Sequence, residues 1–169
     1  MLLMNINTPI KDEAINNLNV GDTIYISGKI FCGRDAVLPK IVSLVEAGKL
    51  AEYDIDLQGG VVFHTAVSLA GIGPTTSNKV EIAGSIPVLS KAGIKIHLGK
   101  GALEQDIVEA LQENNSIFVV TPPVTALFAD NTISQKVAAY PELGMEAFYE
   151  VIVKDMPGIV AIAHGKTIF

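Results

Sequence analysis

Three stretches of the chain place glycine next to a cation or a hydroxyl where a strand is expected to end. The first spans residues 27–35, in which Arg34 follows a run of β-branched and aromatic residues. A guanidinium at such a strand end can donate two parallel hydrogen bonds to the carboxylate of a ligand. Ion pairs that only stabilise structure are also common, so Arg34 can instead pair with a local acid such as Asp35 and hold the turn.

The second stretch is Gly73-Pro74-Thr75-Thr76-Ser77-Asn78-Lys79. It offers three hydroxyls and backbone N–H groups at the predicted start of a helix, where unsatisfied donors and the helix dipole attract anions. The positive charge of Lys79 adds to this attraction. The alternative is that the hydroxyls only cap the helix, although one helix needs fewer caps than this row provides.

The third stretch is Gly99-Lys100-Gly101, a lysine between two glycines at a predicted strand-to-helix turn. It lacks the G-x-x-x-x-G-K-[ST] spacing of a phosphate-binding P-loop. The chain also has no G-x-G-x-x-G after a strand, so a dinucleotide site is not supported. Cations and hydroxyls at three strand ends favour a small dicarboxylate as the ligand.

Residues for nucleophilic or metal chemistry are few. His64, His97 and His164 lie far apart, each inside or at the end of a predicted strand, and their spacing does not suggest a metal site. We expect packed histidines, with His64 as the first exception to consider. Cys32 is the single cysteine and follows a β-rich run, so we expect a buried small hydrophobe. One cysteine excludes an internal disulfide framework and a self-contained iron–sulfur cluster.

The composition predicts a folded chain that does not bind nucleic acid. Among 169 residues, 49% are hydrophobic and 18% are charged, whereas intrinsic disorder needs the opposite balance. The formal charge of −6 does not provide the cationic surface that neutralises phosphates. At this length we expect a single domain over residues 1–169.

No membrane segment or secretory signal is expected. The apolar run at residues 1–4 is too short for a signal peptide and has no basic residue before it. Residues 57–78 contain no Asp, Glu, Lys or Arg, but they include His64, Pro74 and several glycines, which fit a buried strand and a loop better than a membrane span. A cytoplasmic location follows as an expectation.

Strands alternate with helices along most of the chain. We expect Pro39 at the first position of one helix, and Asn78 as the cap of another with Glu81 three residues on. The predicted strands are residues 23–31, 60–65, 94–98, 117–120, 145–153 and 158–164, and residues 71–77 are a predicted loop. The pattern predicts an α/β fold with a mixed, mainly parallel sheet flanked by helices.

Several short motifs resemble the β subunit of class I fumarate hydratase and L(+)-tartrate dehydratase, and they follow one another along the chain in the same order as in that family. This β subunit is equivalent to the C-terminal domain of the single-chain enzymes. The most specific is Gly73-Pro74-Thr75-Thr76-Ser77, which matches the family's G-P-T-T-[SA] signature. The others are Ser27-Gly28-Lys29-Ile30 with Arg34-Asp35-Ala36, Gly99-Lys100-Gly101, Leu143-Gly144-Met145-Glu146-Ala147 and Met156-Pro157-Gly158-Ile159-Val160-Ala161-Ile162. The likeness covers nearly the whole chain.

This resemblance implies a swivelling β/β/α domain that acts beside an α subunit. In the family, three cysteines of that partner bind a [4Fe–4S] cluster. The implied reaction is the reversible hydration of fumarate to malate, or the dehydration of a related hydroxy-dicarboxylate such as L-tartrate. Carried over by position, Thr75 would take part in proton transfer, and the substrate-binding residues would be Arg34, Gly73, Thr76, Lys79 and Lys100.

The chain also departs from the family pattern at several places. Lys79-Val80-Glu81 stands where the family has R-M-D, and the segment after Arg34 lacks the family's histidine. Further differences lie at Ala102-Leu103, at Thr65-Ala66-Val67-Ser68-Leu69 and at Thr121-Pro122-Pro123-Val124. These departures keep open a second hypothesis, a non-catalytic carboxylate-binding or assembly module with the same fold.

Overall fold

The computed structural model describes residues 3–68, 71–76, 78–121 and 131–169. Its strands are β1 (Leu3–Asn7), β2 (Thr23–Gly33), β3 (Val61–Ser68), β4 (Gly71–Thr75), β5 (Ile96–Gly99), β6 (Ile117–Val120), β7 (Thr132–Ala139), β8 (Phe148–Ala163) and β9 (Lys166–Thr167). The α-helices are α1 (Asp12–Asn16), α2 (Leu38–Glu46), α3 (Lys79–Lys91) and α4 (Gln105–Glu113). Two 3-10 helices, η1 (Leu50–Tyr53) and η2 (Pro141–Glu146), lie in the connections.

Five of the strands close into a barrel-like ring in the order β2-β3-β5-β6-β8, with β8 returning to β2. The pairings β1–β2, β2–β3, β3–β5 and β5–β6 are parallel. The long strand β8 pairs antiparallel with β2, β6, β7 and β9. The predicted mixed sheet with flanking helices is therefore confirmed, whereas the mainly parallel character holds only for the run from β1 to β6.

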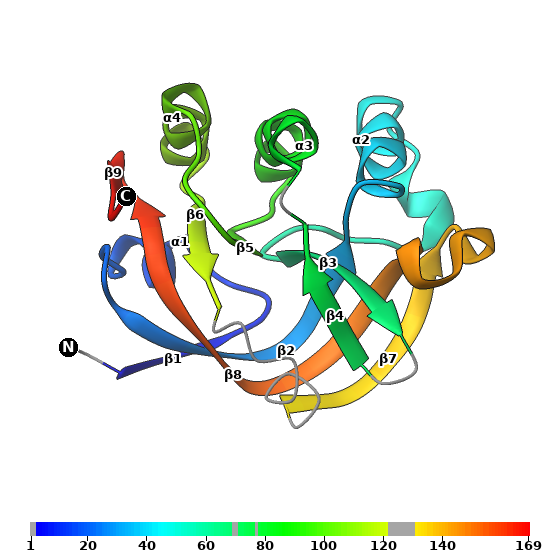
Figure 1. Ribbon diagram of the computed structural model, residues 1–169, viewed down its shortest axis with the longest axis horizontal. Coiled ribbons are helices and arrows are strands. Elements are labelled where there is room, and N and C mark those ends of the chain that lie inside the picture. Colours follow the sequence, from blue (N-terminus) through cyan, green and yellow to red (C-terminus); the bar gives the residue numbers. More distant parts are fainter. Residues whose placement is uncertain (1–2, 69–70, 77, 122–130) are drawn as a thin grey trace.

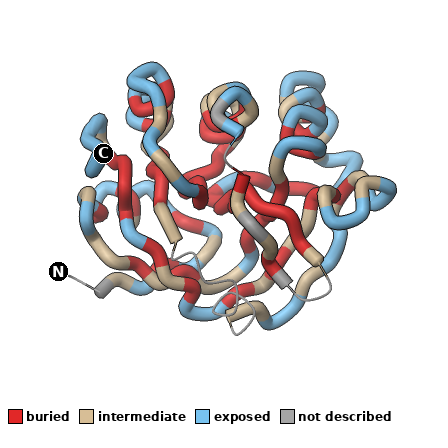
Figure 2. The backbone as a smooth tube through the Cα atoms, viewed as in Figure 1, coloured by how far each residue is buried: buried red, intermediate tan, exposed pale blue. Residues whose placement is uncertain are grey.

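Helices α2, α3 and α4 lie in a row on one side of the ring (Figure 1). Their outward sides are exposed, while much of the sheet beneath them is buried (Figure 2). Because successive residues of a strand face opposite sides, Val61 and Phe63 of β3 enter the barrel interior, whereas Val62 packs under α2. No helix among the described residues is long and apolar enough to cross a bilayer.

The two helix starts follow their sequence signals. Pro39 occupies the first turn of α2, where a missing backbone N–H costs nothing, and Ile41 and Leu44 of this helix are buried. Asn78 caps α3, because its Oδ1 accepts a hydrogen bond from the Glu81 backbone N–H at 3.3 Å. Pro87 lies inside α3 without ending it, since the helix continues to Lys91.

Two predictions about strands are wrong. The predicted loop at residues 71–77 contains strand β4, which pairs antiparallel with β3. Its partner supplies the ladder hydrogen bonds, and a proline is tolerated because the strand lies at an edge. The two strands predicted over residues 145–164 form the single strand β8, because residues 154–155 make a bulge opposite Ser27 of β2 instead of a turn, and Met156 to Gly158 stay paired with β2. Strand β7 has no counterpart among the predicted elements.

Candidate functional site

The parallel strands β2, β3 and β5 end side by side at one edge of the sheet. Their register pairs Gly33 with His64 and Phe63 with Leu98. Arg34 and Lys100 directly follow β2 and β5, and Thr65 follows His64 on β3, so these three residues follow one another along the edge. Ligands of α/β sheets bind outside the carboxyl ends of parallel strands. The structure thus brings the first and third predicted stretches to a place suited for a small ligand.

Strand β4 brings the second stretch to the same edge. Thr75 lies opposite Thr65 in the β3–β4 pair. Thr65 Oγ1 donates a hydrogen bond of 2.6 Å to the carbonyl of Gly73, and a Cβ at Gly73 would lie 3.1 Å from the Ala66 carbonyl oxygen. Glycine therefore permits the close approach of β4 to β3. Within the described residues, the Thr75 hydroxyl has no hydrogen-bond partner.

Thr76 is held much more tightly than Thr75. It is 3% exposed, and its hydroxyl donates to Asp35 Oδ1 at 2.6 Å while accepting from the Asn78 backbone N–H at 3.1 Å. Its own backbone N–H donates to the carbonyl of His64 at 2.9 Å. The hydroxyl proton of Thr76 is thus committed to a protein carboxylate in this structure. Thr76 joins the end of β4 to the β2–α2 connection.

Arg34 pairs with an acid far away in the sequence. Its Nε donates to Glu146 Oε2 at 2.8 Å, and Glu146 ends η2. The suggested pairing partner, Asp35, accepts hydrogen bonds from Thr76 and, at 3.4 Å, from Asn78 Nδ2. The alternative of a pair with a local acid such as Asp35 is therefore wrong, because the fold brings the distant Glu146 to Arg34, while binding of a ligand carboxylate stays a prediction.

The remaining candidates are placed less completely. Lys100 is exposed and directly follows β5. Lys79 begins α3, but its side chain lies outside what the structure describes. Ser77 and Pro122-Pro123 also lie outside the described residues.

A buried pair of histidines lies under α3, next to the candidate site. His64 Nε2 and His97 Nδ1 are 3.1 Å apart, and His97 Nε2 is 2.8 Å from Ser90 Oγ. Burial, and then the neighbouring His64, lower the pKa of His97 well below its usual value. The expectation that these histidines lie far apart is wrong in space, because β3 and β5 are adjacent parallel strands with Val62 opposite His97.

The family model described as Fumarase C-terminus matches residues 2–169. The chain belongs to the fumarase C-terminus family. It is 28% identical over 174 residues to L(+)-tartrate dehydratase subunit beta of Escherichia coli, covering 95% of this chain and 84% of that protein. It is 25% identical over 168 residues to the anaerobic class I fumarate hydratase of Escherichia coli, covering 94% of this chain.

The resemblance inferred from the motifs is thereby confirmed across nearly the whole chain. In size, the chain matches the tartrate dehydratase subunit more closely than the fumarate hydratases. It spans 33% and 30% of the length of two class I fumarate hydratases that it matches. Members of the fumarase C-terminus family therefore occur both as separate subunits and as parts of longer chains.

This member of the fumarase C-terminus family does not itself offer the ligands of an iron–sulfur cluster. Cys32 is its single cysteine, and it is buried in the barrel interior. Burial raises the pKa of the Cys32 thiol, whereas a cluster needs thiolates. Among the described residues, no three or more His, Cys, Asp or Glu side chains are grouped so that they could hold a metal ion. The residues of this chain do not fit a cluster.

Proposed function

We propose that this chain is the β subunit of an iron–sulfur-dependent hydro-lyase. The proposed reaction is the reversible hydration of fumarate to malate, or the dehydration of a related hydroxy-dicarboxylate such as L-tartrate. The observation that carries the proposal is the shared position of Arg34, Thr75 and Lys100 at one edge of the sheet. The names of the similar proteins, a class I fumarate hydratase and a tartrate dehydratase subunit, support it.

The two cations of this edge suit the two ends of a dicarboxylate. In the proposal, the guanidinium of Arg34 and the ammonium of Lys100 bind the carboxylates, and Lys79 adds positive charge at the start of α3. Removing a proton next to a carboxylate builds negative charge, which fixed cations and N–H donors stabilise. Binding and charge stabilisation are thus the expected contributions of these residues.

Thr75 and Thr76 would have different roles in the reaction. We assign proton transfer to Thr75, because its hydroxyl is not committed to another described residue. Thr76 would bind substrate only as a hydrogen-bond acceptor, through its remaining oxygen lone pair, because its hydroxyl already donates a hydrogen bond to Asp35. Gly73 would keep the backbone close enough to β3 to hold both threonines in place.

The partner in this proposal is an α subunit with three cluster-binding cysteines. A [4Fe–4S] cluster held there would supply the Lewis acid that polarises the substrate hydroxyl. The present chain would close over the substrate as the swivelling domain. This division of labour fits a chain whose single cysteine is buried.

The test is to co-express this chain anaerobically with the product of the neighbouring reading frame, and to purify the pair by a tag on one subunit. We expect co-purification and turnover of fumarate or L-tartrate. Arg34→Ala should lower turnover strongly, while Lys49→Ala, which removes an exposed lysine before η1, should not change it. A pair that forms without turning over either compound, or turnover that Arg34→Ala leaves intact, would contradict the proposal.

A second candidate function is a carboxylate-binding module without catalysis. Two observations favour it. The Thr76 hydroxyl already donates its hydrogen bond to Asp35, and the fully buried Leu38 lies in the segment where the family carries a histidine. Calorimetry with succinate on the chain alone distinguishes the two candidates. Tight binding without any partner favours the module, whereas binding that requires the α subunit favours the enzyme.

A further inference from the structure

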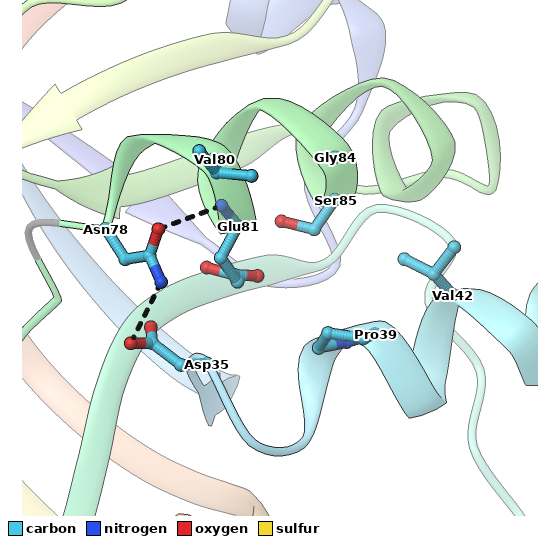
Figure 3. A pocket seen from close by; sticks show the side chains of 8 residues that line it. All are labelled: Asp35, Pro39, Val42, Asn78, Val80, Glu81, Gly84 and Ser85. Carbon is cyan, nitrogen blue, oxygen red and sulfur yellow. Dashed lines mark hydrogen bonds between the residues drawn. The ribbon is translucent and has the colours of Figure 1, made fainter.

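A pocket of about 420 Å³ lies between α2 and the first turns of α3. Figure 3 shows Glu81 and Ser85 on its α3 side, Pro39 and Val42 on its α2 side, and Asp35 below Asn78 at one end. A volume of this size is within the range of small-molecule sites. Asp35 and Asn78, which line this pocket, also hydrogen-bond to the Thr76 hydroxyl. The pocket itself opens between helices α2 and α3.

Polar atoms on the α3 wall are buried and unsatisfied. The side chain of Glu81 is 5% exposed, and neither of its carboxylate oxygens accepts a hydrogen bond from a residue that the structure describes. The same is true of Ser85 Oγ, one helical turn further on. His64 Nδ1 is 3.9 Å from Glu81 Oε2, which is too long for a hydrogen bond. Buried carboxylates without donors are costly, so a donor is expected to reach them.

The pocket has negative charge that its described lining does not neutralise. Asp35 is exposed at the mouth, and its hydrogen-bond donors among the described residues are neutral: the hydroxyl of Thr76 and the carboxamide of Asn78. Glu81 adds a second carboxylate deeper in the wall. No Lys or Arg is among the described residues that line the pocket.

The other walls are apolar. Pro39 and Val42 come from α2, and Val80 on α3 is 84% exposed beside the opening. A valine this exposed next to two carboxylates offers a contact for a short hydrocarbon body. The complementary ligand therefore has an N–H-rich cation at one end and a small apolar group at the other.

We propose that the pocket between α2 and α3 binds a small primary ammonium ion with a short aliphatic body. The ammonium donates to Glu81 and Ser85, whose side-chain oxygens have no hydrogen-bond partner among the described residues, and the carboxylate of Asp35 at the mouth adds to the attraction. The aliphatic body packs against Pro39, Val42 and Val80. This site takes a cation, whereas the sheet edge takes an anion, so the inference does not depend on the proposed hydro-lyase activity.

The probe for the test is 3-methylbutylammonium, titrated into the purified chain by calorimetry and followed by amide chemical shifts in NMR. We expect saturable binding with shifts centred on residues of α2 and α3. The matched compounds 3-methylbutan-1-ol and 4-methylpentanoate keep the body but remove the cation, and they should bind at least about tenfold more weakly. Equal binding of the alcohol, or no binding of the amine, would overturn the proposal.

Two variants locate the site. Glu81→Gln keeps the size of the side chain but removes its charge, and should weaken amine binding about tenfold. Glu46→Gln removes an exposed carboxylate at the other end of α2 and should leave binding unchanged. If Glu81→Gln fails to fold, Ser85→Ala replaces it, with a smaller loss expected. Equal binding by the folded site variant and Glu46→Gln would show that the amine does not occupy this pocket.

Discussion

Arg34 and Glu146 are joined by a hydrogen-bonded ion pair of 2.8 Å, although 112 positions separate them in the sequence. Their side chains are 32% and 28% exposed, so solvent screens much of their attraction. The pair connects the end of β2 to η2, at the edge where the substrate is proposed to bind. We infer that Glu146 serves to aim Arg34 more than to stabilise the fold.

Glu146→Gln should therefore separate stability from binding. The free energy of unfolding should fall by less than about 1 kcal/mol, because the lost pair is partly exposed. In the assembled enzyme, KM for the dicarboxylate should rise several-fold at nearly constant kcat, since a less well oriented Arg34 weakens ground-state and transition-state binding alike. The matched control is Glu142→Gln, an exposed glutamate of the same 3-10 helix. Identical KM values for the two variants would argue against an aiming role.

The hydrogen bonds of Thr76 predict a stability difference between two substitutions. Thr76→Val removes the hydroxyl that donates to Asp35 and accepts from the Asn78 N–H, and should cost about 1–3 kcal/mol of unfolding free energy. Thr76→Ser keeps the hydroxyl and should cost clearly less. Urea unfolding of the three proteins measures the difference. The contact with Asp35 would have no energetic weight if the valine variant were as stable as the serine variant.

Gly48 and Gly59 form a matched pair for testing backbone packing. Both have positive φ, +69° and +71°, but a Cβ at Gly48 meets nothing within 4 Å, whereas one at Gly59 lies 2.9 Å from the backbone N and O of Ile10. Gly48→Ala should cost about 1 kcal/mol from the left-handed conformation alone. Gly59→Ala should cost about 1–3 kcal/mol more, because the backbone must move. Thermal unfolding checks both, and equal losses would contradict the close contact.

The lowered pKa of His97 predicts a pH-dependent stability. In the unfolded chain His97 takes up a proton near pH 6.5, whereas in the folded protein burial and His64 keep it neutral. The unfolded state therefore binds more protons below that pH, and the free energy of unfolding should fall as the pH is lowered from about 6.5. Denaturant titrations at several pH values measure this slope. His97→Gln should flatten it, and an unchanged slope in that variant would contradict the assignment.

Local sequence patterns predicted those parts of the fold whose signals are themselves local. The apolar run of β6, the proline at the start of α2 and the Asn78 cap of α3 all follow short-range rules. Strand β4 was missed because its glycines and proline resemble a loop until β3 provides a pairing partner. The unbroken course of β8 was missed for the same reason, since β2 holds residues on both sides of the bulge.

In the candidate site, too, local patterns predict some features, whereas others depend on tertiary contacts. The strand-end positions of Arg34 and Lys100 could be inferred from glycine and charge patterns. The contacts that hold the site could not, because Glu146 reaches Arg34, and Asp35 reaches Thr76, only through tertiary structure. The predicted strands 60–65 and 94–98 each carry a histidine near the carboxyl end, and pairing these strands as parallel neighbours predicts the contact of His64 with His97.

The most direct test of the shared edge is the turnover of the co-expressed pair with Arg34→Ala and Thr75→Ala combined in this chain. If both residues act on one bound dicarboxylate, the double variant should lose essentially all turnover while still assembling with the α subunit. Its loss should also be smaller than the product of the two single effects, because residues that act together are not additive. Full turnover by an assembled double variant would show that the edge formed by β2, β4 and β5 is not where the reaction takes place.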